Sequence, residues 1–167
     1  MKHLLLYLCG FLISFQVSGA HLSVDAVRAA FVQSANDEDK TEQLLSDLSG
    51  NLSDPLLIAY RAGTEALMGK FSSIPWTKYS YCKQAMKSFQ DAVSKDPSNI
   101  EIRYLRIAVQ ANLPSFLNMS ENIEEDKKVI IKNIQTSSDI SLNKKIAALL
   151  LDKVSCSEAE KSILRKY

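Results

Sequence analysis

The chain has 167 residues, of which 46% are hydrophobic and 23% charged, and this is enough for one domain with a substantial core. Its 20 basic and 19 acidic side chains give no overall basic excess that would attract nucleic acid or an anionic lipid surface. Glycine is scarce, and apolar residues recur at helical spacing throughout. We therefore expect an all-α protein.

The first twenty residues have the pattern of a secretory signal peptide. A short basic start is followed by an almost unbroken apolar run at residues 4–15, and small residues at 18–20 are typical of a cleavage site. The apolar run is shorter than a bilayer-spanning helix requires, although a retained anchor helix is the alternative. We expect export to the periplasm or the medium, and a mature single domain at residues 21–167 without an integral membrane segment.

The mature chain is predicted to form about seven antiparallel helices. Ser23 can cap the first and Asn36 the second. Asp54 and Pro55 are a strong start for the third, which is apolar nearly all round and should be buried centrally. Residues 71–81 then interrupt the helical pattern.

The second half of the chain is predicted to be equally helical. Asp96 and Pro97 end a helix that begins near residue 79. Ser157, with Glu160 three residues later, forms a capping box at the start of the last helix. Between these points we expect helices at 100–112, from about 120, and at 140–153.

Residues 81–97 carry a motif of helical-repeat proteins. Ala85, Phe89, Ala92 and Pro97 fall at the spacing A-x3-F-x2-A-x4-P that ends a tetratricopeptide (TPR) repeat. Residues 56–97 thus resemble one TPR, except that the turn between its helices is expected to be about ten residues longer than usual. Because a stable solenoid needs three or more repeats, the resemblance implies a compact TPR-like bundle whose flanking helices act as caps.

A second resemblance covers residues 54–134. The strings IEIRYLRIAVQANLPSFL and NIEEDKK are similar to those of a group of small exported bacterial proteins that have no established activity. This resemblance implies the compartment and the fold, and it carries no functional residues over to this chain.

The content of histidine and cysteine argues against most enzymes and metal sites. His3 leaves with the signal peptide, and His21 would be the first mature residue, so a histidine-based nucleophile is disfavoured. One histidine and two distant cysteines do not form a zinc ligand set, and we expect no metal or cofactor. Glu65 is the best acid for a carboxylate-based hydrolase, but it stands four residues after Arg61, and an ion pair within the helix is the alternative.

Three arginines form the main predicted binding site. Arg103, Arg106 and Gln110 share one face of the helix at 100–112, and Arg61 lies on the corresponding helix of the preceding pair. If these helices line a groove, as the first helices of TPR pairs do, the guanidinium groups could orient a peptide carboxylate or another anion. Alternatively, they pair inside the bundle with acidic residues, for which the candidates are Glu65, Glu101 and Asp126.

Trp76 and two cysteines complete the set of candidate residues. Trp76 lies in the stretch 74–79, where an exposed aromatic side chain could anchor a partner or could fold back over the end of a helix pair. Cys82 and Cys156 remain after export and could form a disulfide in an oxidising compartment.

These residues favour an exported, non-enzymatic module that binds a protein or peptide partner in a TPR-like groove. A structural accessory subunit of an envelope assembly and a carboxylate-based hydrolase are the alternatives. Internal pairing of all three arginines would favour the accessory subunit.

Overall fold

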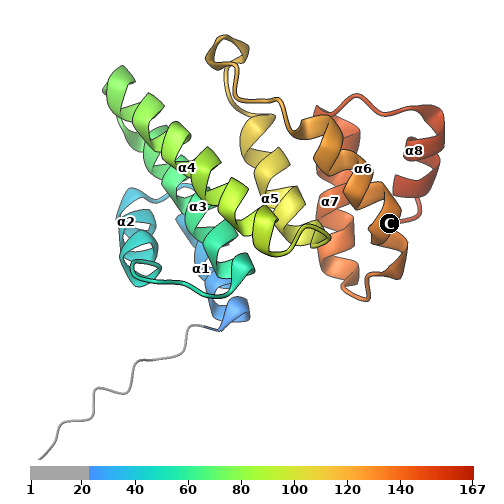
Figure 1. Cartoon of the computed structure of the whole chain (residues 1–167), viewed down its shortest axis with the longest axis horizontal. Helices are drawn as coiled ribbons and strands as arrows, with labels where there is room; N and C mark the ends of the chain where they lie inside the picture. Colours follow the sequence, from blue (N-terminus) through green and yellow to red (C-terminus); the bar gives the residue numbers. More distant parts are fainter. Residues whose placement is uncertain (1–22) are drawn as a thin grey trace, which may run out of the picture.

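Every regular element is a helix in residues 23–167, the part of the chain that the computed structural model describes (Figure 1). The predicted all-α class is confirmed. The predicted signal peptide at 1–20 and His21 lie outside the described residues. The α-helices are α1 (Val24–Ser34), α2 (Glu38–Asp47), α3 (Pro55–Phe71), α4 (Pro75–Lys95), α5 (Ile100–Gln110), α6 (Ile123–Asn133), α7 (Ile140–Lys153) and α8 (Glu158–Leu164), and two 3-10 helices are η1 (Ser115–Leu117) and η2 (Ile134–Thr136).

Side-chain caps fix where several helices begin. Ser23 and Asp54 cap α1 and α3 as predicted, and Ser157 forms the predicted capping box of α8. Each such cap satisfies a backbone N–H that the first helical turn leaves without a partner. The second helix is capped by Asp37, one residue after the predicted Asn36.

The turn between α3 and α4 is short, so the predicted long interruption is wrong. It consists of residues 72–74, and Pro75 is the first residue of α4. A proline at this position is well tolerated because its missing N–H would have no partner in the helix and its φ is already helical. The additional residues lengthen α4 to 21 residues, and Trp76 lies in its first turn.

Consecutive helices form four pairs that stack along the molecule. The pairs are α1 with α2, α3 with α4, α5 with α6, and α7 with α8. Neighbouring pairs meet through their first helices, since α1 contacts α3, α3 contacts α5, and α5 contacts α7. Figure 1 shows this order, with α1 and α2 at one side and α7 and α8 at the other. The helices α1, α3, α5 and α7 therefore form one continuous row.

The core consists of two hydrophobic clusters joined by α5. The first cluster surrounds the fully buried Phe89 and contains side chains of α1, α2, α3, α4 and α5. The second packs α6, α7 and α8 against Ile107 of α5, and the partly buried Tyr104 contacts both clusters. Ten residues of α3 are buried, as its apolar sequence predicted.

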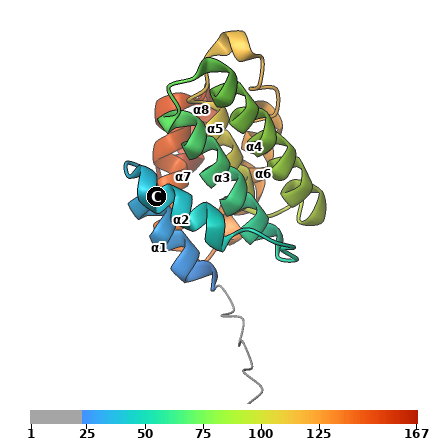
Figure 2. The ribbon, with the colours of Figure 1, turned by 90° about the vertical axis from the view of Figure 1, so that its left-hand side faces the viewer.

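The loop that joins α5 to α6, residues 111–122, projects from the same end of the molecule as the turn between α3 and α4 (Figures 1 and 2). Pro114 precedes η1, and Asn118 then reverses the chain with a left-handed φ of 52°. Asparagine tolerates this conformation better than most residues. The second helix of this pair is thereby delayed until Ile123.

Candidate binding groove

The predicted arginine stripe on α5 faces the core. Arg103 and Arg106 are 3% and 1% exposed, and Gln110 is buried as well. Asp126 of α6, which is fully buried, accepts hydrogen bonds from Nη1 of Arg103 at 2.6 Å and from Nε of Arg106 at 2.7 Å. The structure therefore corrects the expectation that Arg103, Arg106 and Gln110 line a binding surface. The two guanidinium groups instead tie α5 to α6.

Further contacts hold Arg103 in this internal position. Its guanidinium group also donates to the carbonyl oxygen of Pro97 and to the exposed carboxylate of Glu125. Burial alone would lower the pKa of Arg103, but the hydrogen bonds to Asp126 and Glu125 raise it. Arg103 stays charged, and its charge is balanced within the protein.

Arg61 lies apart from the arginines of α5. Its Nε is 3.2 Å from Oε1 of Glu65, which is the predicted ion pair within α3. The other oxygen of Glu65 accepts a hydrogen bond from Ser88 of α4 at 2.8 Å, so both oxygens of this buried carboxylate are engaged. Arg61 borders a separate hollow of about 330 Å³, and the expected convergence of three arginines on one groove is wrong.

The two cysteines of the described part of the chain are free thiols. Cys82 is buried in α4, whereas Cys156 packs against the second hydrophobic cluster, between α7 and α8. Burial raises the pKa of both thiols, which makes them poor nucleophiles. The possible disulfide between Cys82 and Cys156 is not formed: Cys82 belongs to α4, whereas Cys156 lies between α7 and α8.

A groove of about 1100 Å³ runs along the row of first helices. This volume is slightly above the usual upper end of small-molecule pockets, about 1,000 Å³. The start of α4 and the α5–α6 loop border one of its ends. Most of the side chains that line it are apolar or aromatic, among them Phe31 of α1, Leu67 of α3, Ala108 and Val109 of α5, and Leu142 of α7.

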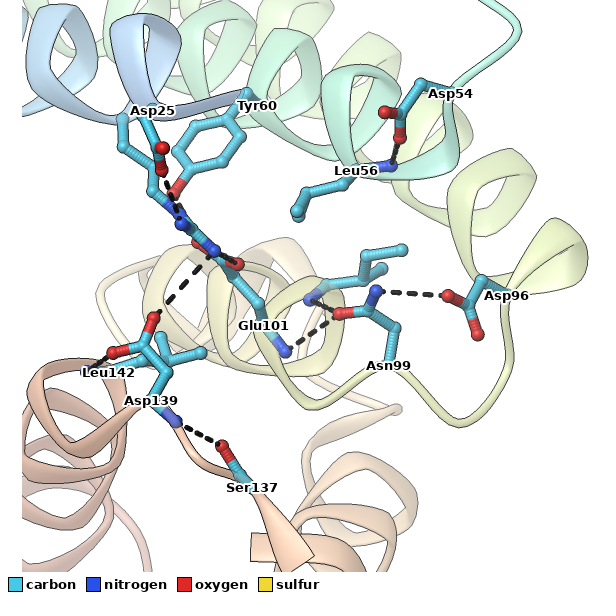
Figure 3. Close-up of polar contacts among 12 residues, drawn as sticks. Asp25, Asp54, Leu56, Tyr60, Asp96, Asn99, Glu101, Ser137, Asp139 and Leu142 are labelled. Atoms are coloured by element: carbon cyan, nitrogen blue, oxygen red, sulfur yellow. Dashed lines mark hydrogen bonds and ion pairs between the residues drawn. The ribbon is translucent and has the colours of Figure 1, made fainter. Parts of the chain in front are cut away.

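One polar network in this groove connects all four of its helices (Figure 3). Glu101 of α5 is buried and accepts hydrogen bonds from Nε of Arg28 of α1 at 2.7 Å and from the hydroxyl of Tyr60 of α3 at 2.6 Å. Nη2 of Arg28 contacts the second oxygen of Glu101 and lies 4.0 Å from Asp139, the residue that caps α7. The network therefore links the four helices across the groove.

The electrostatics of this network keep Tyr60 and Arg28 each in one protonation state. Burial raises the pKa of Tyr60, and the hydrogen bond to Glu101 raises it further. The hydrogen bond to Glu101 also raises the pKa of Arg28, although partial burial opposes this shift. Tyr60 is thus neutral and Arg28 charged over the whole physiological range, so the groove has a permanent polar site among apolar walls.

Three lysines stand at the groove: Lys70, Lys78 and Lys145. Lys70 donates to the carbonyl oxygen of Ala35 at 2.7 Å and is therefore partly engaged. With Arg28, these lysines outnumber the two acidic residues of the groove, which are Glu101 and Asp139. The groove thus has an excess of positive charge, and its polar side chains suit hydrogen bonding and ion pairing to a bound segment.

Exposed aromatic side chains stand at the end of the groove that the two loops border. Trp76 is 76% exposed and lies beside Tyr79, with 5.8 Å between the ring centroids. Phe116 of the α5–α6 loop is 82% exposed. Trp76 does not fold back over a helix pair, and it therefore remains a candidate anchor for a partner.

Sequence reasoning missed the central residues of this groove, Arg28, Tyr60 and Glu101. Glu101 was one of three candidate acidic partners of the arginines under the internal-pairing alternative, but residues two apart, such as Glu101 and Arg103, point in different directions on an α-helix. Glu101 therefore faces α1 and α3, while Arg103 faces α6. The predicted helix that Ser23 caps carries Arg28. If this helix had been interpreted as the first helix of a repeat pair, the sequence would have placed Arg28 at the groove.

No protein-family model, no curated protein and no solved structure matches this chain. Among residues 23–167, no helix is both long and apolar enough to cross a membrane. The same residues contain no group of three or more histidine, cysteine, aspartate or glutamate side chains that could hold a metal ion.

Proposed function

We propose that this chain is an exported, TPR-like, non-enzymatic protein that binds a protein or peptide segment in the groove along α1, α3, α5 and α7. The observation that carries the proposal is the apolar groove of about 1100 Å³ formed by the first helices of successive pairs. Stacked helix pairs that present a continuous concave surface to a partner are the usual design of helical-repeat binding proteins. The pattern of residues 1–20 supports export.

The groove suggests how such a segment would be held. Its apolar walls suit the hydrophobic face of an amphipathic helix or an extended peptide, and burial of that face would supply most of the affinity. The network of Arg28, Tyr60 and Glu101 joins α1, α3 and α5 before a segment binds, so little ordering of these helices would be required on binding. Orientation would come from the lysines beside the groove, in place of the arginines of α5.

The test is a selection from a random peptide library, followed by affinity measurements on the selected peptides. Ala66 and Ala108 line the groove and are only partly buried, so Ala66→Arg and Ala108→Arg would fill it without removing core contacts. Ala148→Arg, on the exposed face of α7, is the matched control. We expect each groove variant to weaken peptide binding by about tenfold or more and the control to leave it unchanged. Selected peptides that bind all three variants equally would contradict the proposal.

A structural accessory subunit is the second candidate function. Arg61, Arg103 and Arg106 are all engaged in internal ion pairs, which favours this function over an anion-binding groove. In this case the groove would be covered permanently by a larger assembly. Measuring the size of the tagged native complex before and after dilution would distinguish the two candidates. A structural subunit would stay in a large complex after dilution, whereas a peptide-binding module would dissociate from its partner.

A further inference from the structure

The end of the molecule at the α3–α4 turn and the α5–α6 loop has an unusual surface, which we call the aromatic end. It consists of the exposed side chains Ile74, Trp76, Tyr79 and Phe116, together with Lys78 and Lys83. In both overall views the turn and the loop project at this same end (Figures 1 and 2). Four of the seven exposed large hydrophobic residues in the described part of the chain lie here, so they are not scattered at random.

The charge pattern of the aromatic end differs from that of the rest of the chain. Residues 66–90 contain four lysines and no acidic residue, and residues 112–120 contain no charged residue at all. The acidic residues that flank these segments are Glu65, Asp91 and Glu121. Glu65 is buried, Asp91 lies near the far end of α4, and Glu121 is the last residue but one of the loop, next to the start of α6. A chain with balanced charge overall is therefore locally basic where its aromatic side chains are exposed.

This combination fits a lipid surface better than it fits a protein. Tryptophan and tyrosine favour the boundary between headgroups and acyl chains, because their rings are apolar at one side and polar at the other. Lysine side chains can lie along the same boundary and keep their ammonium groups among anionic headgroups. The aromatic end combines the start of α4 with the α5–α6 loop, which project at the same end of the molecule, so both can meet an interface without any change in the helices.

We propose that the aromatic end docks this protein peripherally onto an anionic membrane surface. Trp76 from the first turn of α4 and Phe116 from the α5–α6 loop would enter the interface, while Lys78 and Lys83 would contact the headgroups. The groove opens beside this end, because Tyr79 and Phe116 also line it. Docking would therefore present the groove next to the membrane. The inference does not depend on what the groove binds.

The only tryptophan of the chain lies in this surface, so its fluorescence reports directly on docking. The full-length chain is mixed with vesicles of phosphatidylcholine alone and with vesicles that also contain phosphatidylglycerol. We expect a blue shift of Trp76 emission and co-sedimentation with the anionic vesicles, and we expect both to weaken as salt is added. Lys78→Glu with Lys83→Glu should weaken this binding by about tenfold or more. Phe116→Ser with Ile74→Ser should reduce the blue shift and the affinity.

The matched control is Ile140→Ser with Lys144→Glu, which changes an exposed apolar residue and an exposed lysine on α7. It should bind the vesicles as the wild type does. All variants share residues 1–22, so any attraction of the apolar run at 4–15 to lipid is common to them. The proposal is overturned if Trp76 emission is unchanged by either kind of vesicle, or if the aromatic-end variants bind as tightly as the control. It is also overturned if the blue shift depends on protein concentration without vesicles, which would indicate self-association.

Discussion

Inside the protein, two guanidinium groups share one carboxylate. Arg103 and Arg106 both bind Asp126, and all three side chains are shielded from solvent. A buried ion cluster of this kind contributes little net stability compared with apolar packing, but the loss of one member leaves a buried charge without a partner. Glu125, beside Asp126, binds the same arginine from an exposed position, so it offers an internal comparison.

The two acidic residues should therefore differ strongly when they are removed. We expect Asp126→Ala to lower the free energy of unfolding by about 3–5 kcal/mol, because Arg103 and Arg106 would stay buried without their counter-ion. Glu125→Ala removes an exposed pair and should cost less than about 1 kcal/mol. Urea unfolding followed by circular dichroism measures both. Equal effects of the two substitutions would show that the arginines can reach solvent.

For the arginines of α5, the sequence predicted which residues share a face but not which way that face points. Their spacing correctly placed Arg103, Arg106 and Gln110 on one face of α5. It could not identify that face as the inner one, because this depends on the neighbouring α6 and on the carboxylate of Asp126. In the sequence, Asp126 belongs to an acidic run that is typical of the start of any helix.

Helix α3 approaches α4 closely at Gly69. A Cβ atom at Gly69 would lie 3.2 Å from Cβ of Tyr81 and 3.3 Å from the carbonyl oxygen of Lys78. The second of these atoms belongs to the backbone of α4 and cannot move away easily. Because the turn between the helices has only three residues, their ends have little freedom to separate.

A larger side chain at Gly69 should therefore force α3 and α4 apart. We expect Gly69→Val to lower the free energy of unfolding by about 1–3 kcal/mol, the usual cost of overpacking. Gln84→Val is the control, since it places the same β-branched side chain on an exposed position of α4. Thermal unfolding of both variants tests this. A melting temperature for Gly69→Val equal to that of the control would mean that the α3–α4 contact is loose.

Elements with strong local signals were predicted well. Asp54 and Ser157 cap helices as predicted, and the helix at 140–153 has the predicted bounds. Pro75 was misjudged because the same residue can interrupt a helix or begin one. Pro75 begins a helix here because α4 packs along α3, and this packing cannot be predicted from the local sequence.

At the scale of the molecule, the four helix pairs divide between two hydrophobic clusters. Helix α5 packs on α3 and α4 at one side and on α6 and α7 at the other. The groove crosses this junction, and the contact of Arg28 with Glu101 and Asp139 spans it. A groove along the first helices of the pairs was expected from the sequence, but the two clusters and the residues that line the groove could not be predicted, because they depend on how the pairs stack. In stacked helical pairs, stability is a sum of units and of the interfaces between neighbours.

The division into two hydrophobic clusters predicts that the helices around each cluster unfold locally and independently of those around the other. Ile146 is fully buried in the second cluster and Leu44 is buried in the first, and truncation of either should cost about 2–5 kcal/mol. We expect Ile146→Ala to accelerate amide hydrogen exchange in α6, α7 and α8 more than in α1 to α4, because the cavity weakens only the contacts of its own cluster. Leu44→Ala should produce the opposite distribution. Exchange measured by mass spectrometry on peptic fragments resolves the two halves. If both variants accelerate exchange evenly from α1 to α8, then α5 couples the clusters into one cooperative unit, and the groove can change shape only when the whole protein unfolds.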